Sequence, residues 1–320
     1  MAVSFAGSPD RVEARLVPEA GYELDVFRVT GLPRRPGIAL ARSLALAAAA
    51  PVSCARILAR RRPDVVLGAG GFVAGPMVVA ARLRGIPAAL TEADRHLGLS
   101  NRLALPFAQR LFVAYPLDVY TDGKVQVTGR PIPARSRPVA RPEARRAFGL
   151  PDEGRVLLVM GALAGARALN ELAIGAFAAW GPAVLHISGE REYESLRARV
   201  VRPEYVLIPS TDRFGAALGA ADLALSRAGG TVWELAAAGL PAVLVPYPHA
   251  TGDHQFLNAL YFDDGAVVVR EDDVEQVPGL VRGLLDDPGR LERMRDAMLR
   301  KARPDAATEI AEGLIELASA

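Results

Sequence analysis

The chain has 320 residues, of which 51% are hydrophobic and 23% are charged, and its formal net charge is +2. This length suits two domains, and the apolar content excludes a disordered chain because it can build a buried core. The small net charge does not indicate a nucleic-acid-binding protein. The single cysteine, Cys54, excludes a disulfide framework and is typical of a reducing, cytoplasmic setting.

No targeting or membrane-spanning segment is expected. The first residues lack the charged region that precedes the apolar part of a signal peptide. The most apolar long stretch, residues 38–57, contains Arg42, Pro51 and Arg56, which a bilayer-spanning helix would not tolerate. The sequence therefore predicts a soluble protein that is at most peripherally bound to a membrane.

The first part of the chain alternates between predicted strands and helices. Strands are expected at residues 3–6, 24–29, 63–67 and 87–90, and helices at 11–16, 38–62 and 77–84. The helix at 38–62 is expected to be interrupted near Pro51, and a glycine-rich turn at 68–76 precedes the last of these helices.

The alternation restarts after residues 130–143, a proline- and arginine-rich stretch without apolar periodicity that is interpreted as a linker. Strands are expected at 155–160, 183–187, 206–209, 223–225, 242–245 and 266–269, with helices between and after them. Alternating strands and helices favour doubly wound parallel sheets. The predicted domains are 1–129 and 144–302, with a helix at 303–320 that packs back on the first domain.

The stretch 221–258 carries the strongest local pattern. An apolar strand is followed by a turn at Gly229 and Gly230, and a helix begins at Thr231. Backbone N–H groups at such a helix start can bind a phosphate, and Glu234 can accept hydrogen bonds from a ribose diol. The alternative is structural, because Thr231 and Glu234 also have the spacing of a capping box.

Two further glycine-bearing turns, at 68–75 and 161–165, also follow predicted strands. Three such turns in two domains favour a cleft in which backbone amides face a pyrophosphate. A nucleoside-triphosphate hydrolase and a dinucleotide-binding protein are disfavoured because neither glycine motif is present. His249, Asp253 and His254 share a loop, where binding of sugar hydroxyls is favoured over a metal site.

These residues resemble the MurG-type glycosyltransferases of family 28. The resemblance runs from residue 3 to about residue 265 and is carried by several motifs. They are residues 63–76 (PDVVLGAGGFVAGP), 98–102 (GLSNR), 127–131 (VTGRP), 165–170 (GARALN), 226–241 (SRAGGTVWELAAAGLP) and 253–258 (DHQFLN).

The resemblance implies the GT-B architecture, an α/β fold with two Rossmann-like domains facing a cleft. It also implies an inverting transfer of N-acetylglucosamine (GlcNAc) from UDP-GlcNAc to undecaprenyl-diphosphate-linked muramyl pentapeptide, the step from lipid I to lipid II of peptidoglycan. No cofactor or metal is expected, because helix-end amides would stabilise the departing diphosphate. The expected location is the cytoplasmic face of the plasma membrane.

The resemblance also implies site residues. The donor side would be formed by Gly161, Gly165, Arg167, Thr211, Arg227, Gly229, Gly230, Thr231, Glu234, His254, Gln255 and Asn258. The acceptor side would be formed by Gly70, Gly71, Phe72, Glu92, Asp94 and Asn101, with Glu92 and His96 as candidates for the catalytic base. Thr211 would meet the uracil, and His254 and Gln255 the sugar hydroxyls.

The chain departs from the family pattern in places. The opening strand and its Gly-rich, His-bearing loop are not seen, which is best explained by a fragment or a late start site. Residues 161–165, Thr91 to Asp94, and Pro133 also differ from the usual residues. The sequence predicts that this chain binds the donor but transfers sugar slowly.

Two other functions remain open from the sequence. One is a glycosyltransferase of the same fold that acts on a diacylglycerol or another polyprenyl lipid. The other is a catalytically silent sugar-nucleotide-binding module. A peripheral contact with anionic lipid is predicted from the basic residues around the helix at 38–62, which are Arg34, Arg35, Arg56, Arg60, Arg61 and Arg62.

Overall fold

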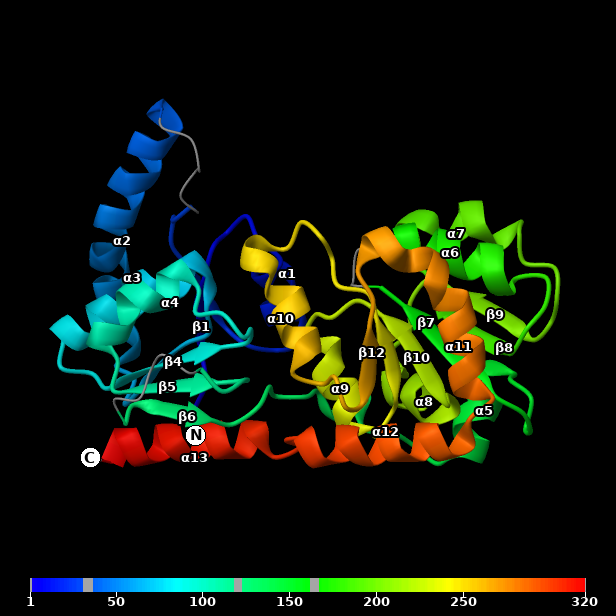
Figure 1. The fold of residues 1–320 in the computed structure, drawn as a ribbon. Coiled ribbons are helices and arrows are strands. Elements are labelled where there is room, and N and C mark those ends of the chain that lie inside the picture. Colours follow the sequence, from blue (N-terminus) through cyan, green and yellow to red (C-terminus); the bar gives the residue numbers. More distant parts are fainter. Residues whose placement is uncertain (1, 31–36, 118–122, 162–166, 320) are drawn as a thin grey trace. The chain divides into compact units, whose positions relative to one another are not determined.

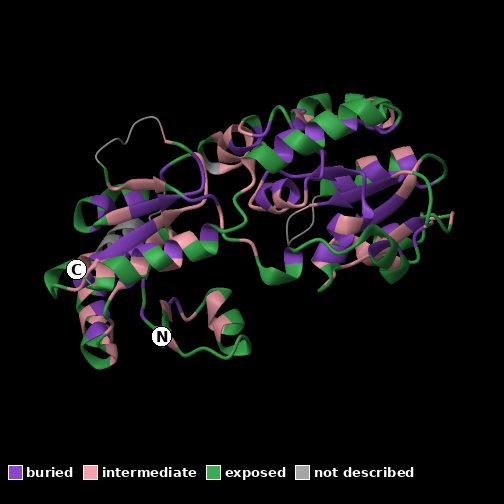
Figure 2. Cartoon of the chain, turned by 90° about the horizontal axis from the view of Figure 1, so that it is seen from below, coloured by how far each residue is buried: buried purple, intermediate pink, exposed green. Residues whose placement is uncertain are grey.

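The computed structural model describes residues 2–30, 37–117, 123–161 and 167–319. The chain divides into two compact units (Figure 1). Unit 1 consists of Met1–Thr128 together with Thr308–Ala320, and unit 2 is Gly129–Ala307. In both units the buried residues lie in the central strands and on the helix faces packed against them, while the outer helix faces are exposed (Figure 2).

Unit 1 contains short parallel strands and the helices between them. In chain order the elements are β1 (Phe5–Gly7), α1 (Glu13–Glu19), β2 (Leu24–Val26), α2 (Ile38–Arg61), β3 (Val66–Gly68), α3 (Gly71–Leu83), β4 (Ala88–Glu92), α4 (Leu99–Ala104), the 3-10 turn η1 (Leu105–Phe107), β5 (Arg110–Val113), β6 (Val125–Val127) and α13 (Ala306–Ser319). Strands β3, β4, β5 and β6 form one parallel sheet in that order, and β1 pairs with β2.

Two predictions for the helices of unit 1 are wrong. Helix α2 runs without interruption through Pro51, because the alanine- and leucine-rich residues on both sides keep its helical conformation despite the missing N–H group. Helix α3 begins at Gly71 rather than at residue 77, so Pro76 lies inside it. Gly70 caps this helix with φ +85°, a conformation that glycine adopts without strain.

Helix α13 is sequence-distant from the sheet of unit 1 but packs on it. Ile310 joins Ala89 and Phe112 in a small apolar cluster. Arg110 bonds to Glu316 at 2.7 Å, across the same contact. A Cβ built on Gly313 would lie 2.7 Å from Phe112 Cζ, so the absent side chain is what allows this close approach. These contacts explain why residues 308–320 group with the first unit.

Unit 2 contains a six-stranded parallel sheet with helices around it. Its elements are the 3-10 turn η2 (Ala134–Ser136), α5 (Arg141–Phe148), β7 (Val156–Met160), α6 (Arg167–Phe177), β8 (Ala183–Ile187), α7 (Glu190–Arg197), β9 (Tyr205–Ile208), α8 (Phe214–Ala220), β10 (Leu223–Ser226), α9 (Thr231–Ala237), β11 (Ala242–Leu244), η3 (Thr251–Asp253), α10 (His254–Leu260), β12 (Ala266–Val268), η4 (Glu271–Gln276), α11 (Val277–Leu285) and α12 (Pro288–Lys301).

The strand order in unit 2 is β12-β11-β10-β7-β8-β9, and every neighbouring pair is parallel. The order reverses between β7 and β10, the first and fourth strands of the unit. Strands β7 and β10 are buried on both faces, as expected for the centre of a doubly wound sheet. In such sheets ligands bind beyond the carboxyl ends of the strands at this switch point.

The segment 130–143, interpreted as a linker, packs within unit 2. Arg141 bonds to the buried carboxylate of Asp222 at 2.8 Å, and the N–H of Val139 donates to the carbonyl of Gly215. Asp222 also accepts from Arg145 and Arg155, each at 3.1 Å. Because these bonds tie the stretch to Gly215 and Asp222, it is ordered although its sequence shows no periodicity.

Candidate functional site

The turn between β10 and α9 lies at the carboxyl edge of the unit 2 sheet, beside the switch point. Gly230 is the N-cap of α9, and no side chain caps the helix. Among the described residues, no acceptor is found for the backbone N–H groups of Gly229, Gly230 and Thr231. These groups, with Glu234, form what we call the donor seat. Its backbone N–H groups can donate the hydrogen bonds that bind an anion.

Glu234 lies in the first turn of α9 and is half-buried. Its Oε1 accepts a hydrogen bond from Ser136 Oγ at 2.5 Å, and Ser136 itself is buried. Burial raises the pKa of Glu234, while the Ser136 bond and the charges of Arg130 and Arg135 act in the opposite direction. The capping-box alternative is not what the structure shows, since Glu234 reaches Ser136 rather than the backbone of Thr231.

The other predicted donor residues at this edge come from the neighbouring strands. Gly161 directly follows β7, and Arg167 begins α6 with an exposed side chain. Gly165 lies outside the described residues. Thr211 follows β9, where its Oγ1 accepts from the N–H of Arg213 at 3.0 Å. The sheet therefore brings Gly161 and the donor seat to adjacent strand ends.

The loop after β11 leads into α10, which carries three predicted donor residues. His254 begins α10. Gln255 Oε1 accepts from the N–H of Tyr247 at 3.0 Å, so this side chain holds the loop in place. Asn258 is completely buried, which gives it a place in the interior of unit 2 rather than on a ligand-facing surface.

Arg227, also predicted on the donor side, is engaged within unit 2. Its Nη1 donates to the carbonyls of Val245 and Pro246 and bonds to Glu271 at 2.5 Å. The side chain is only 8% exposed. Its contacts join the ends of β10 and β11 to η4, and this structural role accounts for the arginine without a ligand.

On the acceptor side, the predicted residues lie beyond β3 and β4. Gly70 and Gly71 both have positive φ, +85° and +67°, at the start of α3. Phe72 follows them, and the guanidinium of Arg11 lies 5.4 Å from its ring centroid. The segment just before α1 thus contacts the first turn of α3.

Glu92 ends β4, and its carboxylate holds the loop that follows. Oε1 accepts from the N–H groups of Ala93 and Asp94, and Oε2 from the N–H of Gly98 at 2.9 Å and from Asn101 Nδ2 at 3.0 Å. With four donors already bonded, Glu92 is poorly placed to take a proton from a substrate hydroxyl. Asn101 is buried, and its Oδ1 has no partner among the described residues.

The histidines differ in their surroundings. His96 is exposed in the loop after β4. His186 is buried in β8 between Tyr205 and Asn170, and burial lowers its pKa to about 3, so it is a neutral core residue. His249 contacts the ring of Tyr247. Among the described residues, no cluster of three or more potential metal ligands is found.

Two residues near the donor seat are not among those predicted, Ser136 and Arg130. Ser136 lies in the stretch interpreted as a linker, and no local pattern marks it. Arg130 belongs to the quoted motif at 127–131, but the motif alone does not say that its side chain reaches Gly230, as the structure shows.

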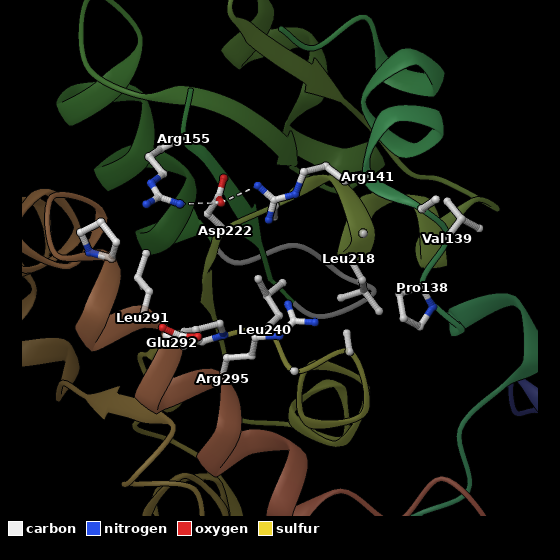
Figure 3. Close-up of a pocket in the computed structure, with 17 residues that line it drawn as sticks. Pro138, Val139, Arg141, Arg155, Leu218, Asp222, Leu240, Leu291, Glu292 and Arg295 are labelled. Carbon is white, nitrogen blue, oxygen red and sulfur yellow. Dashed lines mark hydrogen bonds and ion pairs between the residues drawn. The ribbon is translucent and has the colours of Figure 1, made fainter. Parts of the chain in front are cut away.

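A cavity in unit 2 lies at the opposite edge of the sheet from the donor seat. It measures about 620 Å³ and is lined by residues that include Arg141, Arg155, Asp222 and Arg295 (Figure 3). The first two arginines point toward Asp222, which they bond. Since these charges are paired with one another at the amino ends of the strands, we do not place the functional site here.

None of the described helices combines the length and the apolar run that crossing a bilayer requires.

Two family models match the chain. The family model described as the glycosyltransferase family 28 N-terminal domain matches residues 1–113, and that of the C-terminal domain matches residues 156–310. The N-terminal match lies within unit 1, whereas the C-terminal match covers most of unit 2 and runs into α13.

Two relatives are named UDP-N-acetylglucosamine–N-acetylmuramyl-(pentapeptide) pyrophosphoryl-undecaprenol N-acetylglucosamine transferase. The protein from Salinibacter ruber is 39% identical over 330 residues, which cover 99% of this chain and 88% of the relative. The protein from Mycobacterium bovis is 39% identical over 338 residues, which cover 99% of this chain and 82% of the relative.

Solved structures show the same fold. MurG from Acinetobacter baumannii superimposes with a TM-score of 0.77 at 26% identity, covering 98% of this chain and 91% of that one. A UDP-GlcNAc 2-epimerase from Neisseria meningitidis, bound to UDP-GlcNAc, has a TM-score of 0.63 at 14% identity and covers 98% and 99%. The predicted α/β fold of the GT-B type is confirmed, and the chain belongs to glycosyltransferase family 28.

Proposed function

We propose that the chain transfers GlcNAc from UDP-GlcNAc to undecaprenyl-diphosphate-linked muramyl pentapeptide, converting lipid I to lipid II. The observation that carries this proposal is the 39% identity, over 99% of the chain, to relatives named for that reaction. The donor seat supports it independently, because it lies at the switch point where a nucleotide binds in doubly wound sheets.

On the donor side, the diphosphate and the ribose of UDP each have a partner in the donor seat. The N–H groups of Gly229, Gly230 and Thr231 donate hydrogen bonds to the diphosphate. Glu234 accepts from the ribose diol through the oxygen that Ser136 does not occupy. A single displacement at the anomeric carbon inverts it, and the amides stabilise the charge on the departing diphosphate. No resident cofactor enters this scheme.

On the acceptor side, the loop between β4 and α4 lies next to the glycine turn that opens α3. Glu92 holds the loop through its four hydrogen bonds and orients its neighbours. Of the two base candidates, His96 is then the better placed, because it is exposed and no described residue bonds its ring. We assign Glu92 a positioning role and His96 the role of general base.

The membrane-facing surface of unit 1 is formed by α3 and α4 together with η1. Four large apolar side chains are exposed there, Leu83 at 76%, Leu103 at 63%, Leu99 at 57% and Phe107 at 37%. Leu99 and Leu103 are four residues apart and share one face of α4. We call these residues the α3–α4 patch. Exposed apolar residues that group in this way mark an interaction surface.

Basic residues flank the α3–α4 patch, and they favour an anionic lipid surface as its partner. Arg82, Arg84 and Arg102 are exposed beside the leucines. The basic end of α2, which the sequence predicts as the anchor, is partly neutralised instead. There Arg61 bonds to Asp25 at 2.6 Å, and Arg60 bonds to the same carboxylate. Arg34 and Arg35 lie outside the described residues.

Turnover tests the proposed reaction. Labelled UDP-GlcNAc is offered with a lipid I analogue, with diacylglycerol and with undecaprenyl phosphate, and product is followed by chromatography. Transfer to the lipid I analogue is expected. Transfer only to one of the other lipids, or UDP binding without transfer to any acceptor, would contradict the proposal in favour of a different transferase or a silent binding module.

Flotation with liposomes tests the membrane surface. Vesicles containing anionic lipid are expected to carry the protein at low salt and release much of it at high salt. Replacing Leu83 and Leu103 by serine should abolish flotation, whereas Val201→Ser, at a 74% exposed position in unit 2, serves as the control. Failure to bind at low salt, or equal loss in the control, would exclude the patch.

A further inference from the structure

The side chain of Arg130 lies directly on the glycine turn that opens α9. A Cβ built on Gly230 would come within 2.3 Å of Arg130 Cζ and within 2.6 Å of its Nε and Nη1. The guanidinium therefore lies against the Cα of Gly230, in the space that a side chain at this position would enter. Because Gly230 belongs to the donor seat, a positive charge lies among its unpaired N–H groups.

The backbone just before Arg130 is fixed by close packing. Gly129 is buried, with φ +81°, and a Cβ built on it would lie 2.3 Å from Arg303 Cβ. The same Cβ would be 3.3 Å from the ring of Trp233, which is 1% exposed in α9. The chain thus passes tightly over α9 before it reaches Arg130. This packing fixes the backbone from which the side chain of Arg130 extends to the turn.

The guanidinium is not used in holding the fold. Among the described residues, none forms a hydrogen bond or an ion pair with it, and its side chain is half-exposed. The charge of Arg130 does act on Glu234, in the first turn of α9, where it favours the ionised carboxylate. The contrast with Arg227 is clear, since Arg227 donates to two carbonyls and to Glu271. The five N–H donors of Arg130 are available to a ligand.

We propose that Arg130 is a catalytic residue that binds the diphosphate of the donor and stabilises the charge on departing UDP. This inference rests on the proposed function. A planar guanidinium can bond two phosphate oxygens at once, which a single ammonium cannot match in geometry. It would therefore add a full positive charge to a seat whose other donors are neutral amides.

In the transfer step, the acceptor hydroxyl oxygen forms a bond to the anomeric carbon while the bond from that carbon to the β-phosphate oxygen breaks. The electron pair of the broken bond leaves with UDP, and the hydroxyl proton passes to the general base. Negative charge grows on the β-phosphate, and Arg130 contacts that group. Stabilisation of charge that develops in the transition state raises kcat rather than only lowering KM.

Binding of UDP and of uridine separates the role of Arg130 from that of the rest of the donor seat. For Arg130→Gln, titration calorimetry should show UDP binding weakened roughly ten- to a hundredfold, the range for hydrogen bonds to charged groups. Uridine has no phosphate, so its affinity should stay within about twofold of the parent's. The UDP affinity of Arg130→Lys should lie between those of the parent and of Arg130→Gln. Lysine keeps the positive charge but lacks the planar set of N–H donors of the guanidinium.

Kinetics give the second readout. Arg130→Gln should lower kcat by roughly 10²–10³-fold, as removal of a transition-state hydrogen-bond donor does elsewhere. Arg135→Gln is the matched control, since Arg135 also acts on Glu234 while the atoms nearest to Gly230 belong to Arg130. The control should change neither UDP affinity nor kcat by more than about threefold, the scale of a screened surface charge.

Unchanged or tighter UDP binding by Arg130→Gln would overturn the inference, and so would an equal loss of UDP and uridine binding, which would mean that the seat itself is damaged. These outcomes leave the proposed function standing, because the parent chain still turns over lipid I. A parent chain that binds neither UDP nor uridine would overturn both proposals.

Discussion

Two glutamates lie at the carboxyl edges of the two sheets, Glu92 at the end of β4 and Glu234 in the helix that follows β10, and they are used differently. Glu92 in unit 1 accepts three hydrogen bonds from its own loop and a fourth from Asn101. Glu234 in unit 2 accepts one, from Ser136, and no other described residue bonds it. A carboxylate whose oxygens are filled by its own loop holds that loop, whereas one with an open oxygen in a half-buried turn can accept from a ligand.

The sharpest test of this contrast is to remove Glu92. Glu92→Ala leaves the N–H groups of Ala93, Asp94 and Gly98 without their acceptor, so the free energy of unfolding should fall by about 3 kcal/mol or more. UDP affinity should be unchanged, because the donor seat belongs to unit 2. Denaturant unfolding and titration calorimetry measure the two quantities. A stable Glu92→Ala protein that had lost only turnover would instead make Glu92 the base.

Glu234→Gln should give the reverse pattern. UDP binding is expected to weaken by about 1.5–3 kcal/mol, because the ribose diol loses a charged acceptor. The free energy of unfolding should stay equal or rise slightly, since burial disfavours the charged carboxylate. The matched control is Glu271→Gln, which alters a carboxylate bonded to Arg227 and should leave UDP affinity intact. Equal UDP affinity in Glu234→Gln and parent would remove the ligand role.

A smaller effect concerns pH. The pKa of Glu234 is raised, first by burial, so its charged form is lost at a higher pH than for an exposed glutamate. UDP affinity should therefore decline on acidification with a midpoint above the ordinary value of 4.5. This decline should be absent in Glu234→Gln. Calorimetry between pH 4 and 8 on parent and variant would measure it, and identical pH profiles would contradict it.

The stability of unit 2 has an acid dependence of its own, which sets the lower limit of that pH series. His186 has a pKa of about 3 in the fold against an ordinary value of 6.5, so the unfolded chain binds a proton that the folded chain does not. Its contribution to stability is therefore fully present above pH 6.5 and falls as pH drops toward 3, by about 1.4 kcal/mol per pH unit. His186→Gln should flatten this slope in denaturant unfolding.

The parts of the fold that the sequence predicted are those with local causes. The run from β10 through the glycine turn into α9 was expected because apolar residues, two glycines and a helix start follow one another directly. The Ser136–Glu234 bond could not be expected, since 98 positions separate the two residues and Ser136 has no periodic neighbours. The position of the Arg130 side chain could not be predicted either, because it depends on how Gly129 packs against the sequence-distant Trp233.

Where single residues decide between two local structures, the sequence patterns were misleading. Pro51 was expected to interrupt α2, yet tertiary packing and strong helix-forming neighbours keep the helix continuous. Gly71 and Pro76 were expected in a turn, but both lie within α3. The hydrogen bonds by which Glu92 holds its loop could not be predicted either, because no sequence pattern displays them.

The helix α13 has a consequence for how the protein is made. Unit 1 is discontinuous in sequence, because Thr308–Ala320 completes a unit otherwise formed by Met1–Thr128. A ribosome that adds about 5–20 residues per second must translate all of unit 2 before Ile310 can cover Ala89 and Phe112. The unit that is synthesised first is therefore finished last. Until then its sheet carries an uncovered apolar surface, the period in which a nascent chain most needs protection from aggregation.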